Sequence, residues 1–117
     1  MEMRFSKKQS ESLSVLEMYK YKLSEQADRD LLSIITYISF DLFNPDAADD
    51  LNDEIFKTIN DITLFPKSHP VISTSKYEYR RAVVRKYKIV YYIDGKMIVI
   101  ARLYAPKQLV NEEESSL

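Results

Sequence analysis

"YEYRRAVVRKYKIVYYIDGKMIVIARLY", residues 77–104, decides the fold of this chain, because it holds three runs of strand-forming residues in close succession. The runs are 77–84, 87–93 and 97–104. Each is rich in β-branched and aromatic residues, which favour the pleated backbone of a sheet. Consecutive strands with such short connections pair in antiparallel fashion. The stretch therefore predicts a three-stranded antiparallel meander.

Two short turns connect these strands. Asp94-Gly95 is a strong signal for a two-residue hairpin turn, because such turns need positive φ angles that glycine adopts freely. Gly95 is also the only glycine of the chain. The other turn would have to be made by Arg85-Lys86, without a glycine.

Two amphipathic helices precede the meander, at 25–43 and from Pro45 to Phe65, because apolar residues recur there every three or four positions. Asn44-Pro45 separates them, since Pro45 disfavours a helical Asn44 but suits the first position of a new helix capped by Asn44. The apolar positions are Ala27, Leu31, Ile34, Ile35, Ile38 and Leu42, then Ala48, Leu51, Ile55, Ile59 and Ile62. We predict an antiparallel helix hairpin that packs on the sheet.

A first strand comes before the helices. "MYKYKL", residues 18–23, alternates apolar and charged residues as an edge or half-buried strand does. Ser24 follows as a plausible N-cap of the first helix. Segment 66–77, with two prolines, is predicted to be a loop. The order β-α-α-β-β-β predicts a two-layer α+β fold in which the first strand joins the sheet of the meander.

The length of 117 residues fits one domain. We expect residues 18–108 to form it, with 1–17 as a poorly packed N-terminal extension and 109–117 as an acidic tail. No apolar run approaches the roughly 20 residues needed to cross a bilayer, so no membrane association is expected. No secretory signal is visible and the chain has no Cys, which favours a cytoplasmic location.

The net charge of −1 hides a strong asymmetry. Residues 24–65 carry ten Asp or Glu against two Lys or Arg, whereas residues 76–108 carry nine Lys or Arg against two acidic residues. A domain with this distribution can present one face to a polyanion and another to a basic partner or to water.

The cations of the predicted sheet are interleaved with tyrosines. Strand alternation places Arg81 and Arg85 on one face of their strand, and Lys88 and Tyr92 on one face of the next. This combination suits nucleic acid, because cations neutralise phosphates and aromatic rings stack on bases. The alternative is that Lys and Arg only keep a solvent-exposed sheet from aggregating. We interpret the cluster as a surface for a polyanion or an acidic partner, made of Arg80, Arg81, Arg85, Lys86, Lys88, Arg102 and Tyr104.

Other signals of catalysis are weak. His69, the only histidine, lies in the prolyl loop, where a solvent-exposed role is commoner than that of a general base. One histidine and no cysteine do not form a transition-metal site, and one glycine cannot form a phosphate-binding loop, so we expect no metal and no cofactor. The carboxylate pairs of the second helix are interpreted as its solvated face.

Four segments together resemble the ParE branch of the RelE/ParE superfamily, the toxins of type II toxin–antitoxin modules. These are "YKLSEQADRDLLSIITYI", "NPDAADDLNDEIFKTINDITLFP", "YRRAVVRKYKIVYYID" and "IVIARLY", in this order, and the resemblance runs from Tyr19 to about Gln108. It implies a helix hairpin on a curved antiparallel sheet, growth inhibition and plasmid stabilisation in bacteria, and neutralisation by a cognate antitoxin in a heteromeric complex.

The resemblance leaves the target open between DNA gyrase and the ribosome with its mRNA. If the chain is a ribosome-dependent mRNA endonuclease, Arg81 and Lys88 would stabilise the phosphorane and Tyr104 or Lys107 would approach the leaving oxygen. Many nuclease relatives have His where this chain has Ala105. That departure, and the Asn-Pro-x-Ala-Ala joint between the helices, favour a gyrase-directed toxin without catalysis. A third reading is a non-toxic binding module of the same fold.

The antitoxin is expected to bind at the first strand. Tyr19, Tyr21 and Leu23 alternate with lysines there, so an antitoxin strand could pair with this edge of the sheet. The helix hairpin could receive an amphipathic antitoxin helix. Many antitoxin C-terminal segments in the superfamily are acidic, which would suit the basic sheet.

Overall fold

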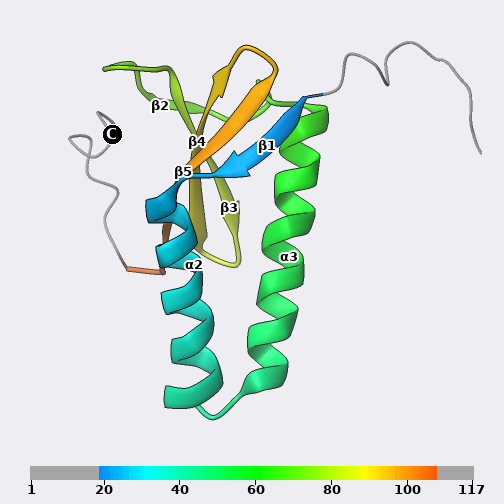
Figure 1. Ribbon diagram of the computed structural model, residues 1–117, viewed down its shortest axis with the longest axis vertical. Coiled ribbons are helices and arrows are strands. Elements are labelled where there is room, and N and C mark those ends of the chain that lie inside the picture. Colours follow the sequence, from blue (N-terminus) through cyan, green and yellow to red (C-terminus); the bar gives the residue numbers. More distant parts are fainter. Residues whose placement is uncertain (1–18, 108–117) are drawn as a thin grey trace, which may run out of the picture.

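The computed structural model of the protein describes residues 19–107 (Figure 1). The expectations about 1–17 and 109–117, and the domain ends at 18 and 108, lie outside the described residues. The elements are β1 (Lys20–Leu23), α2 (Glu25–Thr36), a π-helix η1 (Tyr37–Asp41), α3 (Pro45–Leu64), β2 (Val71–Ser73), β3 (Tyr79–Val84), β4 (Tyr87–Asp94) and β5 (Met97–Tyr104). In the described residues, no helix has the length and apolar character needed to cross a membrane.

The sheet confirms the predicted α+β fold. Its five strands lie in the order β1-β5-β4-β3-β2, with β1 parallel to β5 and the other neighbours antiparallel. The meander is β3-β4-β5, and β1 joins it at one edge. The prediction that 66–77 is entirely loop was wrong, because Val71–Ser73 pairs with β3 at the other edge. Pro70 directly before it is tolerated there, since the start of an edge strand needs no donor from that residue.

Helices α2 and α3 form the predicted antiparallel hairpin, and its joined end extends well beyond the sheet (Figure 1). Ser24 caps α2 by accepting a 3.0 Å hydrogen bond from the Ala27 amide, and Asn44 caps α3 by accepting one of 3.1 Å from the Ala47 amide. The core between helices and sheet contains the predicted apolar face of α3, with Ala48, Leu51, Ile55, Ile59 and Ile62 buried against Ile89, Tyr91, Ile98 and Ile100.

One predicted core position at the end of the first helix was wrong. Leu42 is 53% exposed. The first helix ends as a π-helix, in which the Leu42 amide donates to the Tyr37 carbonyl five residues earlier. The wider turn rotates Leu42 off the apolar face on which regular α-helical spacing had placed it.

One of the two hairpin turns lies where it was predicted and the other is shifted. Asp94 pairs with Met97, so the β4–β5 turn consists of Gly95-Lys96 and lies one residue later than predicted, with Gly95 at φ 64°. The β3–β4 turn is made by Arg85-Lys86 as predicted, although both residues have positive φ angles, 48° and 72°, that usually select Gly or Asn.

A β-bulge in β5 decides which side chains reach which face of the sheet. Tyr91 pairs with Ile100 whereas Val90 pairs with Arg102, so Ala101 is an extra residue. Beyond it the alternation of β5 is shifted by one position. Leu103 therefore joins the core beside the helices, while Arg102 and Tyr104 turn to the opposite face, which we call the outer face.

Candidate functional site

The outer face collects several of the predicted site residues in two adjacent rows across the sheet. One row is Arg81, Val90 and Arg102, and the next is Val83, Lys88 and Tyr104. We call them the outer-face rows. Three of the four residues predicted for catalysis thus lie together, although they are far apart in the sequence. Lys107, the fourth, is an exposed residue that follows β5 with a φ of 73°.

Tyrosines surround the rows. The rings of Tyr77 and Tyr92 stack at 3.8 Å, and Tyr79 meets both edge-on at 6.0 and 5.3 Å. Burial, and then the neighbouring Tyr77, raise the pKa of Tyr92 to about 12, and burial likewise raises the pKa of Tyr79. These two hydroxyls are therefore protonated at neutral pH and are able to donate hydrogen bonds. The Arg102 guanidinium lies over the Tyr104 ring, at 4.9 Å from its centre.

Within residues 19–107, two buried donors on this face have no hydrogen-bond partner. They are the Tyr79 hydroxyl and the Arg81 Nε. The two residues are next but one on β3 and so point to the same side of the sheet. Buried donors are almost always paired in folded proteins, and an unpaired one needs an explanation. A carboxylate or phosphate oxygen is the kind of group that both donors could bind.

Arg102 has a structural role at the edge of β5. The Asp30 carboxylate accepts hydrogen bonds from Arg102 Nε at 2.8 Å and from the Leu103 amide at 2.9 Å. The Ser24 hydroxyl donates to the Ala101 carbonyl at 2.8 Å. Strand β1 pairs only with residues 97–100 of β5. Farther along this edge of β5, Ser24 and Asp30 at the start of α2 supply the hydrogen-bond partners instead. Arg102 is thereby fixed on α2.

The other predicted cations lie elsewhere. Arg80 faces the opposite side from Arg81, forms a 2.6 Å ion pair with Glu78 and donates to the His69 carbonyl at 2.7 Å. Arg85 forms a 2.6 Å ion pair with Glu54 of α3, and its hydrogen bond to Glu54 raises its pKa. Lys86 is exposed in the β3–β4 turn.

His69 does not lie with the outer-face rows. Its ring meets the buried Tyr91 ring edge-on at 6.2 Å, and Tyr91 belongs to the core between sheet and helices. The Tyr91 hydroxyl donates to the Pro66 carbonyl at 2.6 Å, and burial raises the pKa of Tyr91 to about 12. Across 19–107, no cluster of His, Asp and Glu has the composition of a metal site.

The predicted antitoxin-binding residues, in β1 and directly before it, face the helix layer. Tyr19 and Leu23 pack against the core, and the Tyr21 ring lies 6.4 Å from that of Phe56 on α3. Strand β1 is the terminal strand of the sheet, so its outer edge pairs with no other described strand. The backbone of β1, more than these side chains, is what this edge offers to a partner strand.

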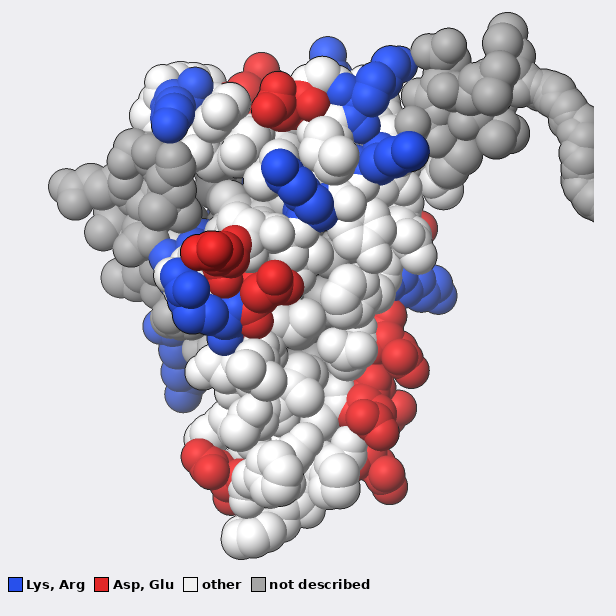
Figure 2. All heavy atoms as spheres, viewed as in Figure 1, with Lys and Arg blue, Asp and Glu red and all other residues white. Residues whose placement is uncertain are grey.

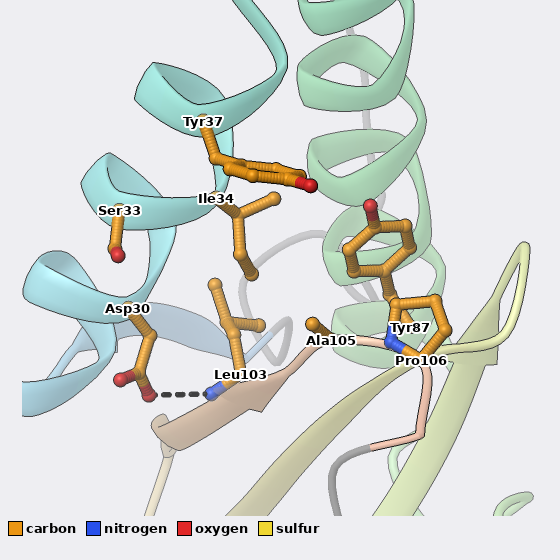
Figure 3. Close-up of a pocket in the computed structure, with 8 residues that line it drawn as sticks. All are labelled: Asp30, Ser33, Ile34, Tyr37, Tyr87, Leu103, Ala105 and Pro106. Carbon is orange, nitrogen blue, oxygen red and sulfur yellow. Dashed lines mark hydrogen bonds between the residues drawn. The ribbon is translucent and has the colours of Figure 1, made fainter. Parts of the chain in front are cut away.

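Sequence reasoning missed a pocket of about 380 Å³ between the first helix and the end of the sheet (Figure 3). The first helix provides one wall, and Tyr87 with the residues from Leu103 onward provides the other. Ala105, noted in the sequence as a departure from nuclease relatives, helps to line it together with Pro106. The lining residues are Asp30, Ser33, Ile34, Tyr37, Tyr87, Leu103, Ala105 and Pro106. The mixed lining suits an apolar side chain with a polar end.

Residues 21–108 match the model of the family described as "ParE toxin of type II toxin-antitoxin system, parDE". No curated protein matches the chain. A chain of the chromosomal ParDE toxin–antitoxin system from P. aeruginosa is similar in structure, with a TM-score of 0.63 and 18% identity over 78% of this chain and 99% of that one. A chain of the toxin–antitoxin complex RelBE2 from Mycobacterium tuberculosis gives a TM-score of 0.52 and 19% identity over 74% and 96%.

Proposed function

Because the chain belongs to the ParE toxin family of type II toxin–antitoxin systems, we propose that it inhibits bacterial growth by binding DNA gyrase. The family match carries the toxin assignment. The choice of gyrase is supported by the composition of the outer-face rows, which contain no histidine and no carboxylate. Cleavage of RNA needs a group that takes a proton from the ribose 2′-OH and one that gives a proton to the leaving oxygen. Binding inhibition needs neither.

A ribosome-dependent mRNA endonuclease is the second candidate. Arg81, Lys88 and Tyr104 come together on the outer face, and Arg81 Nε has no partner within the described residues. Two cations beside a phosphate would stabilise the charge of a phosphorane, and a tyrosine hydroxyl could donate to the leaving oxygen. These observations favour a site for a phosphate group, although a carboxylate of a protein partner has the same chemistry.

Growth measurements after induced expression of residues 18–117 test the proposal. We expect loss of viability, with DNA synthesis in pulse-labelled cells falling before protein synthesis, together with a DNA-damage response. Early loss of protein synthesis with cuts in mRNA would replace gyrase by the nuclease candidate. Normal growth in the presence of soluble protein would leave a non-toxic binding module of the same fold.

We also propose that an antitoxin neutralises this chain by occupying two places. One is the open edge of β1, where an antitoxin strand would extend the sheet. The other is the pocket between the first helix and the end of β5, where an apolar side chain of an antitoxin helix would be buried (Figure 3). Co-expression with the product of any small reading frame found next to the gene tests this, since a stable complex and restored growth are expected.

A further inference from the structure

The joined end of the helix hairpin exposes a cluster of large apolar side chains, which we call the hairpin tip. Tyr37 and Leu42 are each 53% exposed, Phe40 is 70% exposed and Phe43 is 87% exposed. Together these four residues present on the order of 500 Å² of surface, which is as large as the largest apolar patch of a typical monomeric protein. They lie within seven consecutive residues, at the end of the hairpin that extends beyond the sheet (Figure 1).

The backbone of the hairpin tip is strained in a way that produces this exposure. The five residues Tyr37–Asp41 form a π-helix, and Phe43 has a φ of 53°, in the left-handed region that bulky side chains rarely adopt. The Asn44 amide then donates to the Ile38 carbonyl. Single π-helical turns and left-handed bulky residues concentrate at functional sites, where a binding role maintains them. Phe43 gains little packing within the described chain in return for this conformation, because most of its surface is exposed.

The surroundings of the hairpin tip are acidic. Residues 30–56 contain seven Asp or Glu and no Lys or Arg. Asp41, Asp46, Asp49, Asp50 and Asp53 are exposed. Figure 2 shows the same distribution on the face drawn, with red and white but no blue at the lower end of the molecule. An acidic rim repels nucleic acid and anionic membranes, and it attracts a basic surface.

We propose that the hairpin tip is a docking surface for a protein that presents an apolar groove rimmed by Lys and Arg. Phe40 and Phe43 would enter the groove, and the aspartates of α3 would pair with the basic rim. Aromatic anchors that are buried at the centre of an interface supply most of its affinity, while surrounding charges accelerate and orient the encounter. The proposal goes beyond toxicity and neutralisation. It assigns a basic protein partner to the hairpin tip, in addition to the acidic or polyanionic partner expected on the basic sheet.

A pair of synthetic amphipathic helices tests the proposal on the full-length chain. Both peptides carry leucines on one face, and the other face carries lysines in one peptide and glutamates in the second. We expect the lysine peptide to shift the amide NMR signals of residues 37–50, with an affinity that falls as salt is added. The glutamate peptide should leave these signals unchanged. Equal binding of both peptides, or shifts confined to the sheet, would overturn the proposal.

Two double variants control for nonspecific apolar binding. Phe40→Ser with Phe43→Ser should weaken binding of the lysine peptide at least about ten-fold, as expected when aromatic anchors are lost. Leu64→Ser with Phe65→Ser removes a matched exposed apolar pair at the other end of α3 and should change the affinity less than about two-fold. Similar losses in both variants would contradict the assignment.

Two further outcomes would assign the hairpin tip to another occupant. Concentration-dependent dimers in sedimentation experiments that disappear in the Phe40→Ser, Phe43→Ser variant would show that a second copy of the chain covers it. Binding to phosphatidylcholine vesicles that depends on the same two residues would show a lipid surface. Either result would overturn the proposal of a basic protein partner.

Discussion

Asp30 connects helix and sheet through one carboxylate. It accepts from the Arg102 side chain and the Leu103 backbone amide at the edge of β5, and its side chain is only 11% exposed. Sequence patterns assigned Asp30 to the acidic segment and Arg102 to a target-binding surface. The structure instead pairs the two, so that one cation of the basic strand holds the helix in place.

Replacing Asp30 should therefore destabilise the whole fold. Asp30→Ala removes the acceptor of the largely buried Arg102 Nε and of the Leu103 amide, which we expect to lower the free energy of unfolding by roughly 2–4 kcal/mol. Asp30→Asn keeps an acceptor oxygen but loses the charge, so about half of that loss is expected. Urea denaturation of the three proteins measures both values. A change below about 0.5 kcal/mol in Asp30→Ala would mean that solvent replaces these bonds.

The buried tyrosines make stability depend on pH in the alkaline range. Burial raises the pKa of Tyr91 to about 12, whereas the unfolded value is about 10, so folding favours the neutral phenol. The stabilisation is complete below pH 10 and is lost as the pH rises from about 10 to 12, by up to about 1.4 kcal/mol per pH unit for this residue. Denaturation at a series of pH values, with tyrosinate absorbance as a second signal, measures this slope.

Tyr91→Phe is the matching control. It removes the 2.6 Å hydrogen bond to the Pro66 carbonyl and should cost about 1 kcal/mol at neutral pH. Its stability should then fall less steeply above pH 10, although Tyr92 still titrates there. An unchanged slope in Tyr91→Phe would place the alkaline transition on other groups.

Among the elements, the β3–β4 turn carries avoidable strain. Lys86 has a φ of 72° and is exposed, so glycine can take its place with little loss of contacts. We expect Lys86→Gly to raise the free energy of unfolding by about 1 kcal/mol. Lys76→Gly, where φ is not positive, should instead lower it by roughly 0.5 kcal/mol. Thermal unfolding of both variants distinguishes relief of strain from the loss of a surface lysine.

The pocket between the first helix and the end of β5 predicts a variant that selectively loses the antitoxin. Ala105→Phe should fill the pocket from its own wall and compete with an incoming side chain. We expect affinity for the antitoxin to fall at least about ten-fold, the size of one lost apolar anchor. Leu64→Phe enlarges an exposed residue elsewhere and is the control. Isothermal titration with the purified antitoxin measures the affinity of both variants. Equal affinities would exclude the pocket as part of the antitoxin-binding site.

Regular periodicity explains which elements could be predicted from the sequence. The strands of the meander, both helix caps and the apolar face of α3 follow from alternation, capping and 3.6-residue spacing. Irregular features, which do not follow the two-residue period of a strand or the 3.6-residue period of a helix, were missed. The π-helix at Tyr37–Asp41 and the bulge at Ala101 each add one residue to a regular pattern, and each changes which side chains face outward. Strand β2 has only three residues and depends on β3 for its conformation.

Residues of the candidate site could be predicted from the sequence, but not which of them lie together on the outer face. Alternation placed Arg81 and Lys88 correctly on one face, because both strands are regular. Tyr104 joined them only through the bulge. Arg80 lies on the other face of β3, where it pairs with Glu78, and Arg85 lies in the β3–β4 turn, where it pairs with Glu54. The pocket at Ala105 depends on how far the first helix stands from the sheet, which packing alone decides.

On the scale of the whole molecule, the two layers carry opposite charge. The acidic helix hairpin and the basic sheet can therefore contact different partners at the same time. If the outer face binds the cellular target, Arg81→Ala should reduce growth inhibition, because losing one charge-assisted contact lowers affinity by roughly 10- to 100-fold. Lys57→Ala removes an exposed cation from α3 and should leave growth inhibition intact. Viable counts after induction compare the two, with circular dichroism to establish folding. Equal toxicity of both variants would place the target site elsewhere.

The parallel pairing of β1 with β5 has a consequence for the time at which the protein becomes active. Ser24, directly after β1, donates a hydrogen bond to the carbonyl of Ala101 in β5, 77 positions later in the chain. A nascent chain leaves the ribosome from its N-terminus, so β1 and both helices emerge long before the strand that they need. Hydrophobic positions of the hairpin have no finished sheet to cover until the last strand is made. The domain therefore cannot assemble while translation is incomplete, and a message truncated before the codons of Met97–Tyr104 encodes a chain without β5, the strand that pairs with both β1 and β4.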